Sequence, residues 1–318
     1  MGISRRLSLA VVLTCGLVLG ASFPGAAPQF GEWQPAVKLG DAINSVATYG
    51  ACISRGGLSL FVTRGSGANA DIYVAERPSV AEEWGEAVPL GAPVNLAGSE
   101  DMIPFLSRDE HWLFFTSNRS GSQGRDQWMA YRPNVHDNFG WQPAVNLGSD
   151  VNSSAAETSG SFFENEGGTP FLYFASNRLM PSPPGGSAPP PGNDIYVSPL
   201  LPDGTFGAAV RDDALSTNLG GVKDYEGRPM IRFDGREIIF LSDRDGGAGG
   251  YDLYAATRET VEAPWSEPVR LTTLNTAGNE MHPYLSPDGE TLFFTRSVSG
   301  ILSIYMTTRE RPGMGHQK

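Results

Sequence analysis

Acidic residues and arginines recur along this chain at equivalent positions of a repeated pattern. A carboxylate beside a guanidinium group can bind a ligand or catalyse proton transfer. A residue present in every copy of a repeat occupies several equivalent places, whereas a catalytic site needs one. We therefore interpret both columns first as structural ion pairs, because buried charges are seldom left unpaired. The alternative is a charged ring that forms a ligand or partner surface. The columns are the acids Asp101, Glu157, Glu226 and Glu280 and the arginines Arg64, Arg119, Arg178, Arg244 and Arg296.

Acids outside these columns are candidates for a different chemistry. Most glycoside hydrolases use a pair of Asp or Glu residues, one as acid and the other as base or nucleophile. Here the sequence context of each such acid is a loop or turn, which favours solvated charge over a catalytic pair, and we assign no catalytic residue. The acids concerned are Glu164, Glu166, Asp212, Asp213 and Asp224.

Metal chemistry has little support in the sequence. The segment 243–252 places carboxylates as in a loose calcium loop, but it lacks a third early ligand and a closing Glu, so we interpret it as a Gly-rich turn. The four histidines are scattered, with no pair at the spacing of zinc ligands. No nucleophile elbow and no phosphate loop occurs in the sequence. We expect no metal and no cofactor.

The elements that must position these residues belong to one unit repeated five times. The copies start near residues 33, 84, 141, 206 and 265, four of them at a Trp and one at Phe206. Each copy continues with an Asn, an apolar stretch, a turn that is Asp-Gly in its fullest form, and two further short runs rich in Phe, Tyr, Ile and Val. Four strands in each unit of about 50–60 residues predict an all-β, five-bladed β-propeller with four-stranded antiparallel blades.

The two ends of the repeat predict how the ring closes. The chain opens with a strand-like segment, Trp33–Leu39, that precedes any complete unit. The fifth unit ends after Ser303–Met306 without such a segment. We expect Trp33–Leu39 to be the outer strand of the last blade, because this pairing removes an open sheet edge.

The repeat resembles a known family. The repeat pattern is similar to the TolB-like (WD-like) β-propeller repeat. Its parts are Ser-Pro-Asp-Gly, as in Ser286–Gly289, Leu-Phe-Phe, as in Leu292–Phe294, and Asp-Ile-Tyr, as in Asp194–Tyr196 of another copy. The added Trp-x-x-Pro-x-x-Leu-Gly…Asn…Glu pattern looks like the variant of exported bacterial proteins, some of which carry OmpA-type domains. The resemblance covers about residues 33–309. It implies the propeller fold and an envelope location, and leaves the function open because such propellers serve many roles.

The N-terminus has the layout of a secretory signal peptide. Arg5 and Arg6 precede the apolar run 7–20, and small residues follow up to Ala27. We predict a signal peptide over 1–27, a propeller over 28–311 and a short tail over 312–318. Lipidation of Cys15 is an alternative, weakened by Thr14 and by the apolar run that continues past the cysteine. The protein is then exported to the periplasm, the outer-membrane periphery or the extracellular space.

Composition excludes some partners. The net charge is −12 and no cluster of Lys and Arg appears, which argues against nucleic acid. We expect no transmembrane span after signal removal, a monomer, and a buried, unpaired Cys52. A Pro-rich insertion at 179–192 is either a partner-contact loop or a tolerated insertion.

Two function classes follow. We favour a non-catalytic binding or assembly module of the bacterial cell envelope, which contacts protein or glycan through one propeller face, over an enzyme. The alternative is a carbohydrate-active, glycoside hydrolase-like enzyme with its site in the central channel. Unpaired carboxylates that converge in a deep central pocket favour the enzyme, and acids that are all paired with arginines favour the module.

Overall fold

The computed structural model describes residues 30–165, 168–178, 192–216 and 225–311. The predicted signal peptide with Cys15, nearly all of the Pro-rich insertion 179–192, and the tail 312–318 lie outside these residues. The domain limits, export and the role of the insertion therefore stay predictions. No helix within the described part of the chain is long and apolar enough to cross a membrane.

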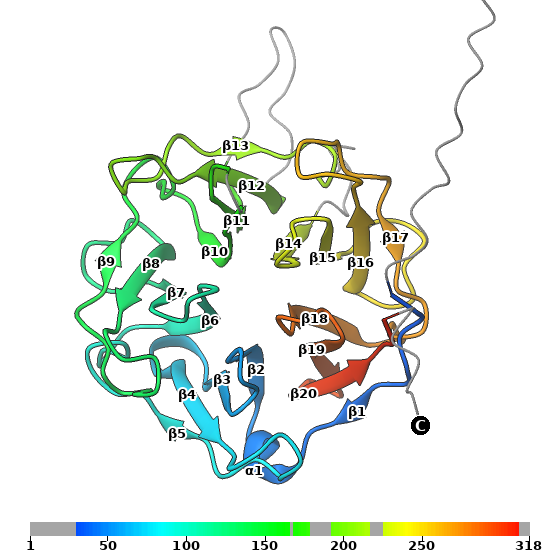
Figure 1. Ribbon diagram of the computed structural model, residues 1–318, viewed down its shortest axis with the longest axis horizontal. Helices are drawn as coiled ribbons and strands as arrows, with labels where there is room; N and C mark the ends of the chain where they lie inside the picture. The colour runs from blue at the N-terminus through cyan, green and yellow to red at the C-terminus, as the bar shows by residue number, and fades with distance from the viewer. Residues whose placement is uncertain (1–29, 166–167, 179–191, 217–224, 312–318) are drawn as a thin grey trace, which may run out of the picture.

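The described residues form five antiparallel sheets of four strands each, arranged around a central axis (Figure 1). The predicted five-bladed β-propeller is thereby confirmed. In each blade the first strand lies innermost and the short fourth strand lies outermost. Blade 1 contains β2 (Thr48–Ile53), β3 (Ser59–Arg64), β4 (Asp71–Glu76) and β5 (Val88–Pro89). Blade 2 contains β6 (Asp101–Leu106), β7 (Trp112–Ser117), β8 (Asp126–Tyr131) and β9 (Val145–Asn146).

The remaining three blades repeat this order. Blade 3 contains β10 (Glu157–Phe163), β11 (Phe171–Ser176), β12 (Asp194–Pro199) and β13 (Val210–Arg211). Blade 4 contains β14 (Glu226–Ile231), β15 (Glu237–Ser242), β16 (Asp252–Thr257) and β17 (Val269–Arg270). Blade 5 contains β18 (Asn279–Leu285), β19 (Thr291–Val298), β20 (Ile301–Thr308) and β1 (Val37–Lys38). The helical elements described are α1 (Asp41–Asn44) and the short 3₁₀ turn η1 (Gly67–Asn69).

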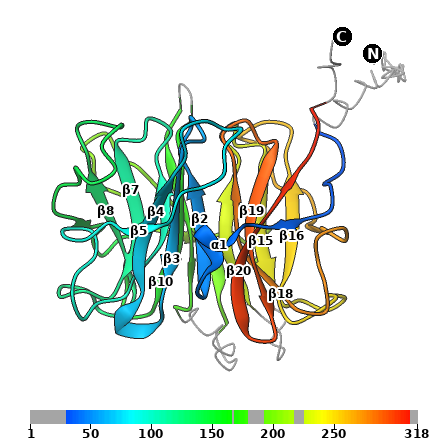
Figure 2. The same ribbon diagram turned by 90° about the horizontal axis from the view of Figure 1, so that it is seen from below.

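The core lies between neighbouring blades. The second strand of each blade carries an aromatic or aliphatic run whose residues are buried on both faces, as expected for a sheet packed between two others. One Phe in each of these strands has no exposed surface: Phe61, Phe115, Phe174, Phe240 and Phe294. Seen from the side, the strands run between the two faces of the ring (Figure 2). We call the face where the innermost strands begin the entry face, and the face that carries the turns after those strands the turn face.

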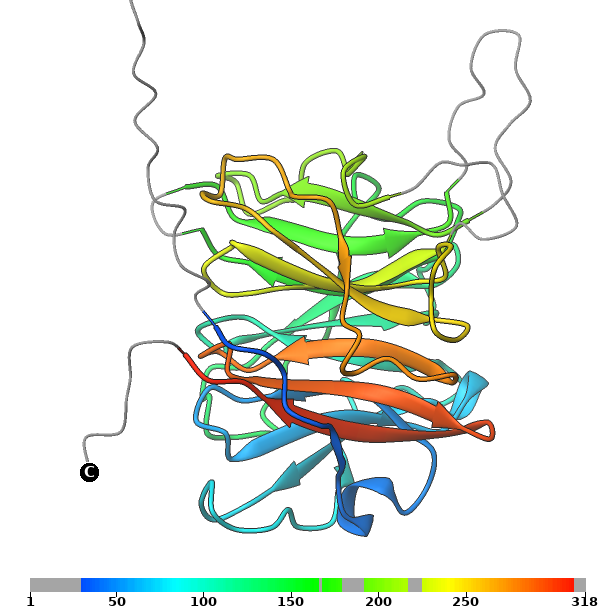
Figure 3. The same ribbon diagram turned by 90° about the vertical axis from the view of Figure 1, so that its right-hand side faces the viewer.

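The N-terminal segment closes the ring as predicted. Strand β1 pairs antiparallel with β20, with Val37 opposite Met306 (Figure 3). Asn44 adds a clamp, because its side-chain amide donates to the carbonyl of Ile304 at 3.0 Å and accepts from the amide of Ile304 at 2.8 Å. The guanidinium of Arg309 stacks over Trp33 at 4.3 Å. The two ends of the propeller are therefore joined through backbone and side-chain contacts.

The Asn that follows the start of each unit has this clamping role in several blades. In three further blades the Asn side chain bonds to both the N–H and the C=O of one residue in the third strand of the preceding blade. These residues are Asn95, Asn152 and Asn275. The fourth Asn of this column, Asn218, lies outside the described residues. In that blade the hydroxyl of Ser216 accepts the amide of Ile195. This short polar clamp satisfies backbone groups where the two-residue outer strand ends.

Candidate functional site

The two charged columns meet within blades. Each arginine at the end of a second strand reaches the acid at the start of the first strand of its own blade, and all four acids have no exposed surface. Each of these arginines also stacks over an aromatic ring of its blade. The pairs are Arg119–Asp101 at 2.6 Å, Arg178–Glu157 at 3.1 Å, Arg244–Glu226 at 3.3 Å and Arg296–Glu280 at 2.8 Å.

The first blade departs from this pattern because Thr48 replaces the acid. There the guanidinium of Arg64 donates to the carbonyls of Ala42, Ile43 and Ala87 at 2.9–3.1 Å. The geometry agrees with the structural interpretation of both columns. Their role as a ligand or partner surface stays a prediction.

The central channel is narrow. One residue of each innermost strand, the third in four blades and the fourth in β18, has a left-handed backbone, and the pairing register shifts at that point. The cavity beside these residues measures about 30 Å³, which holds a water molecule and excludes a sugar ring. The residues are Gly50, Ile103, Ser159, Arg228 and His282. This cavity by itself has no room for a sugar ring, and the channel site of the glycoside hydrolase-like alternative stays a prediction.

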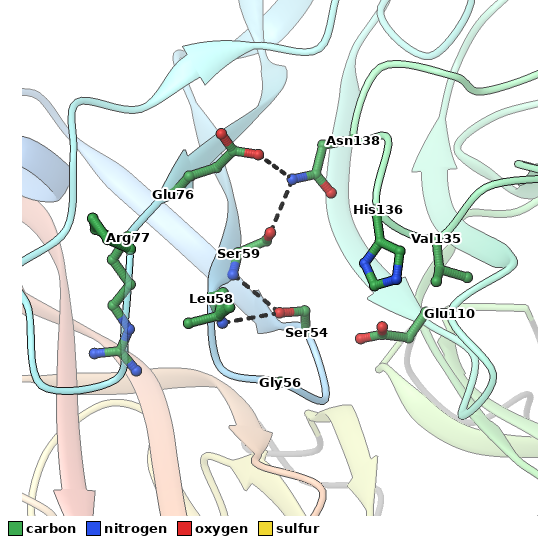
Figure 4. A pocket seen from close by; sticks show the side chains of 11 residues that line it. Ser54, Gly56, Leu58, Ser59, Glu76, Arg77, Glu110, Val135, His136 and Asn138 are labelled. Carbon is green, nitrogen blue, oxygen red and sulfur yellow. Dashed lines mark hydrogen bonds between the residues drawn. The ribbon is translucent and has the colours of Figure 1, made fainter.

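A larger cavity opens on the turn face between blades 1 and 2 (Figure 4). Its volume is about 560 Å³, within the range of sites for small ligands. The β2–β3 turn with Ser54 lies at its floor, the end of β4 with Glu76 lines one side, and Glu110 with the segment 135–138 lines the other. We call this cavity the inter-blade groove.

Glu76 is held by a residue from the next blade. The side-chain amide of Asn138 donates to its Oε1 at 2.6 Å and to the hydroxyl of Ser59 at 2.9 Å. Asn138 is itself buried, and its Oδ1 accepts from the buried guanidinium of Arg132 at 2.8 Å. The second carboxylate oxygen of Glu76 makes no hydrogen bond to the residues that the structure describes, so it can meet a ligand.

Glu110 occupies a position that glycine fills elsewhere in the ring. In the turns of blades 1, 4 and 5 the equivalent residues are Gly57, Gly235 and Gly289, with φ of 70°, 69° and 74°. Glu110 has φ of 63°, a left-handed conformation that costs a residue with a side chain roughly 1–2 kcal/mol. Its Oε1 accepts the backbone amide of Arg55. The turn therefore bears a strained residue whose carboxylate reaches the groove, an arrangement frequent at functional sites.

A guanidinium and an imidazole border the same groove. The guanidinium of Arg77 stacks over Trp84 at 4.2 Å, and its Nε donates to the carbonyl of Gly57 at 2.7 Å. Burial lowers the pKa of Arg77, yet an arginine stays charged at neutral pH. His136 is exposed on the opposite side, near Glu110 (Figure 4). The groove thus presents two carboxylates, one guanidinium, one imidazole and hydroxyls to a polar ligand.

Sequence reasoning missed both groove carboxylates. Glu76 is the last residue of the apolar strand β4, and the strand pattern carries no signal that its side chain borders a cavity. Glu110 carried a usable signal, since Asp109-Glu110 stands where other turns read Asp-Gly. Of the acids outside the columns, Glu164 and Asp212 are half-buried, and burial raises the pKa of both. Neither of them is among the described residues that line the inter-blade groove with Glu76 and Glu110.

Three further features that the sequence singled out lie within the described residues. Oδ2 of Asp252 accepts the amides of Ala248 and Gly249, which agrees with the Gly-rich turn expected over 243–252. Within the described ranges, no group of three or more His, Cys, Asp or Glu lies close enough together to hold a metal ion. Cys52 is buried without a disulfide partner, and burial raises the pKa of its thiol to about 12.

Comparison with protein families and with curated proteins finds no match for the sequence. Solved structures share its fold. The α-L-arabinofuranosidase from Podospora anserina, in complex with cellotriose, aligns at a TM-score of 0.60 and 12% identity over 90% of this chain and 98% of that one. A thermostable family-43 glycoside hydrolase aligns at a TM-score of 0.56 and 14% identity, over 83% of this chain and 89% of that one. The endo-arabinase from Bacteroides thetaiotaomicron aligns at a TM-score of 0.54 and 17% identity, over 86% of this chain and 97% of that one.

These similarities correct two expectations. The prediction of a non-catalytic envelope module is contradicted, because the fold neighbours described above are glycoside hydrolases. At such low identity the shared property is the five-bladed fold. A protein described as TolB from Agrobacterium tumefaciens aligns at a TM-score of 0.47 and 13% identity, which is too low to place the chain in that family. The propeller implied by the TolB-like resemblance is confirmed, and the family is not.

Proposed function

We propose that this protein is a glycoside hydrolase-like enzyme that binds a saccharide in the inter-blade groove. The observation that carries the proposal is the placement of Glu76 and Glu110 on opposite sides of a cavity of about 560 Å³ (Figure 4). Hydrolysis of a glycosidic bond requires one carboxyl group to protonate the leaving oxygen and a second to act as nucleophile or to activate water. The five-bladed fold shared with arabinofuranosidases and an arabinase supports an arabinose-containing glycan as substrate.

The other lining residues suit a sugar. Hydroxyl groups of a saccharide both donate and accept hydrogen bonds, and Ser54, Arg77 and His136 together offer both kinds of partner. Asn138 acts as a positioning residue, because it fixes Glu76 through a 2.6 Å hydrogen bond from a buried site. Export through the segment 1–27 is part of the same proposal, since it brings the enzyme to envelope or external glycans.

The test is hydrolysis of 4-nitrophenyl α-L-arabinofuranoside and of arabinan by the purified protein. Glu76→Gln and Glu110→Gln are each expected to lower kcat on arabinan by at least about 100-fold, the usual contribution of a general acid or base. Glu267→Gln, at an exposed site in blade 4, is the matched control and is expected to keep full activity.

The roles of the two carboxylates separate in a rescue experiment. Sodium azide restores a variant that lost its nucleophile, and a substrate with a good leaving group restores a variant that lost its acid. Absence of hydrolysis by the parent protein on both substrates, or full activity in both glutamine variants, refutes the proposal.

A further inference from the structure

A second polar site lies in the central channel, and it shares no lining residue with the inter-blade groove. Its centre is formed by Arg228 of β14 and His282 of β18, which line the same cavity of about 30 Å³. Both residues have left-handed backbones, with φ of 57° and 50°. The bulged backbone fixes the position of both side chains, and each left-handed residue costs roughly 1–2 kcal/mol of stability.

The charge of Arg228 has no counter-ion among the described residues. Its Nη1 donates to the hydroxyl of Ser159. Its Nε is buried without a hydrogen-bond partner, and Nη2 donates to no group in the described part of the chain. The edge formed by Nε and Nη2 is thus unoccupied, and this edge matches the two oxygens of a carboxylate.

His282 adds a second unsatisfied group. It is 8% exposed, and neither ring nitrogen has a hydrogen-bond partner in the described structure. Burial and the neighbouring Arg228 lower its pKa well below the ordinary value. The neutral imidazole keeps one N–H donor. A buried donor without a partner costs about 1–3 kcal/mol, so a ligand that accepts from it gains binding energy.

The surroundings on the entry-face side supply donors and little negative charge. The ring of Tyr49 contacts that of His282 at a centroid distance of 5.4 Å. Burial raises the pKa of Tyr49, so its phenol stays protonated at neutral pH. Glu100 is neutralised by Arg125, with bonds of 2.6 and 3.2 Å. The net charge of this cluster is therefore positive.

We propose that the channel binds a carboxylate group through the Nε and Nη2 atoms of Arg228 and a ring nitrogen of His282. Arg228 is half-buried, and its Nε is buried without a partner. An uncompensated guanidinium in this setting is costly, and a bound carboxylate removes that cost by forming a bidentate pair. The cavity admits the carboxylate group itself, and the remainder of the ligand extends towards the entry face. The group can belong to a small carboxylic acid or to an acidic sugar, and these sources share the recognition chemistry.

Calorimetric titration of the whole protein with sodium acetate tests the site, with acetamide as a neutral analogue of the same shape. Acetate is expected to bind and acetamide is not. Arg228→Lys keeps the charge and loses the planar fork, and is expected to weaken acetate binding by at least about tenfold, the equivalent of one charge-assisted hydrogen bond. Arg55→Gln, in an exposed turn outside the cavity, is expected to bind as the parent does.

The melting temperature of the parent protein gives a second measurement that needs no variant. Acetate is expected to raise it with concentration, and sodium chloride at equal ionic strength is expected not to. If D-glucuronate binds more tightly than acetate and D-glucose does not bind, the ligand is an acidic sugar. If D-glucuronate and acetate bind with equal affinity, the ligand is a small carboxylic acid. Absence of acetate binding, an equal effect of chloride, or unchanged affinity in Arg228→Lys overturns the proposal.

Discussion

Replacing Arg119 by alanine strands a carboxylate that has no exposed surface. Asp101 then keeps two donors, the hydroxyl of Ser117 at 2.6 Å and the amide of Leu96 at 2.8 Å, and loses the guanidinium at 2.6 Å. Breaking a buried ion pair by removing one partner costs about 3–5 kcal/mol. We expect Arg119→Ala to lower the free energy of unfolding by that amount, measured by urea denaturation with an unchanged m value.

Arg64 offers a matched control in the same column. It is about as buried as Arg119, at 7% against 5% exposed, and its partners are carbonyl oxygens because Thr48 stands at the acid position. Arg64→Ala strands no charge, so we expect a loss of about 1–2 kcal/mol from its hydrogen bonds.

The double variant Arg119→Ala/Asp101→Ala removes the stranded charge and is expected to recover part of the loss, as a double-mutant cycle detects. Equal losses in the two single variants, with no recovery in the double one, would show that the ion pair does not stabilise the blade and refute the reasoning.

Three further predictions concern closure, the strained turn and the buried thiol. Deletion of residues 28–40 is expected to lower the melting temperature of the ring, because it removes β1 and the Trp33–Arg309 contact, whereas deletion of 312–318 is expected to leave it unchanged. Glu110→Gly is expected to keep or raise the melting temperature, because relief of the left-handed backbone adds up to about 1 kcal/mol to the free energy of unfolding. The same variant is expected to lose the hydrolysis of arabinan. Cys52 is expected to resist a thiol reagent at pH 8 in the native protein and to react after denaturation. Because the folded thiol keeps its proton to about pH 12 and the unfolded thiol releases it near 9, stability is expected to fall as pH rises between these values. A parent-like melt for the first deletion, a destabilised Glu110→Gly, or rapid native labelling of Cys52 contradicts the respective prediction.

The sequence by itself determined the architecture of this protein. Blade number, strand order and closure depend on a pattern repeated five times, in which short apolar runs and tight turns recur in the same order in every copy. The pairing of Trp33–Leu39 with the last blade followed from counting strands, because an unpaired edge is unfavourable. The sequence also predicted that the Arg and acid columns form ion pairs, because buried charges need partners, and four such pairs are present.

Tertiary structure alone decided where a ligand can bind. Glu76 meets Asn138 across 62 positions of sequence, and Arg228 meets Ser159 across 69, so no local pattern relates either pair. The sequence suggested a channel site because propellers have a central axis. The bulges of the innermost strands narrow that axis to a cavity of about 30 Å³, and the larger groove lies between two blades. Cavities depend on how side chains of different blades pack together, and that packing is a property of the closed ring.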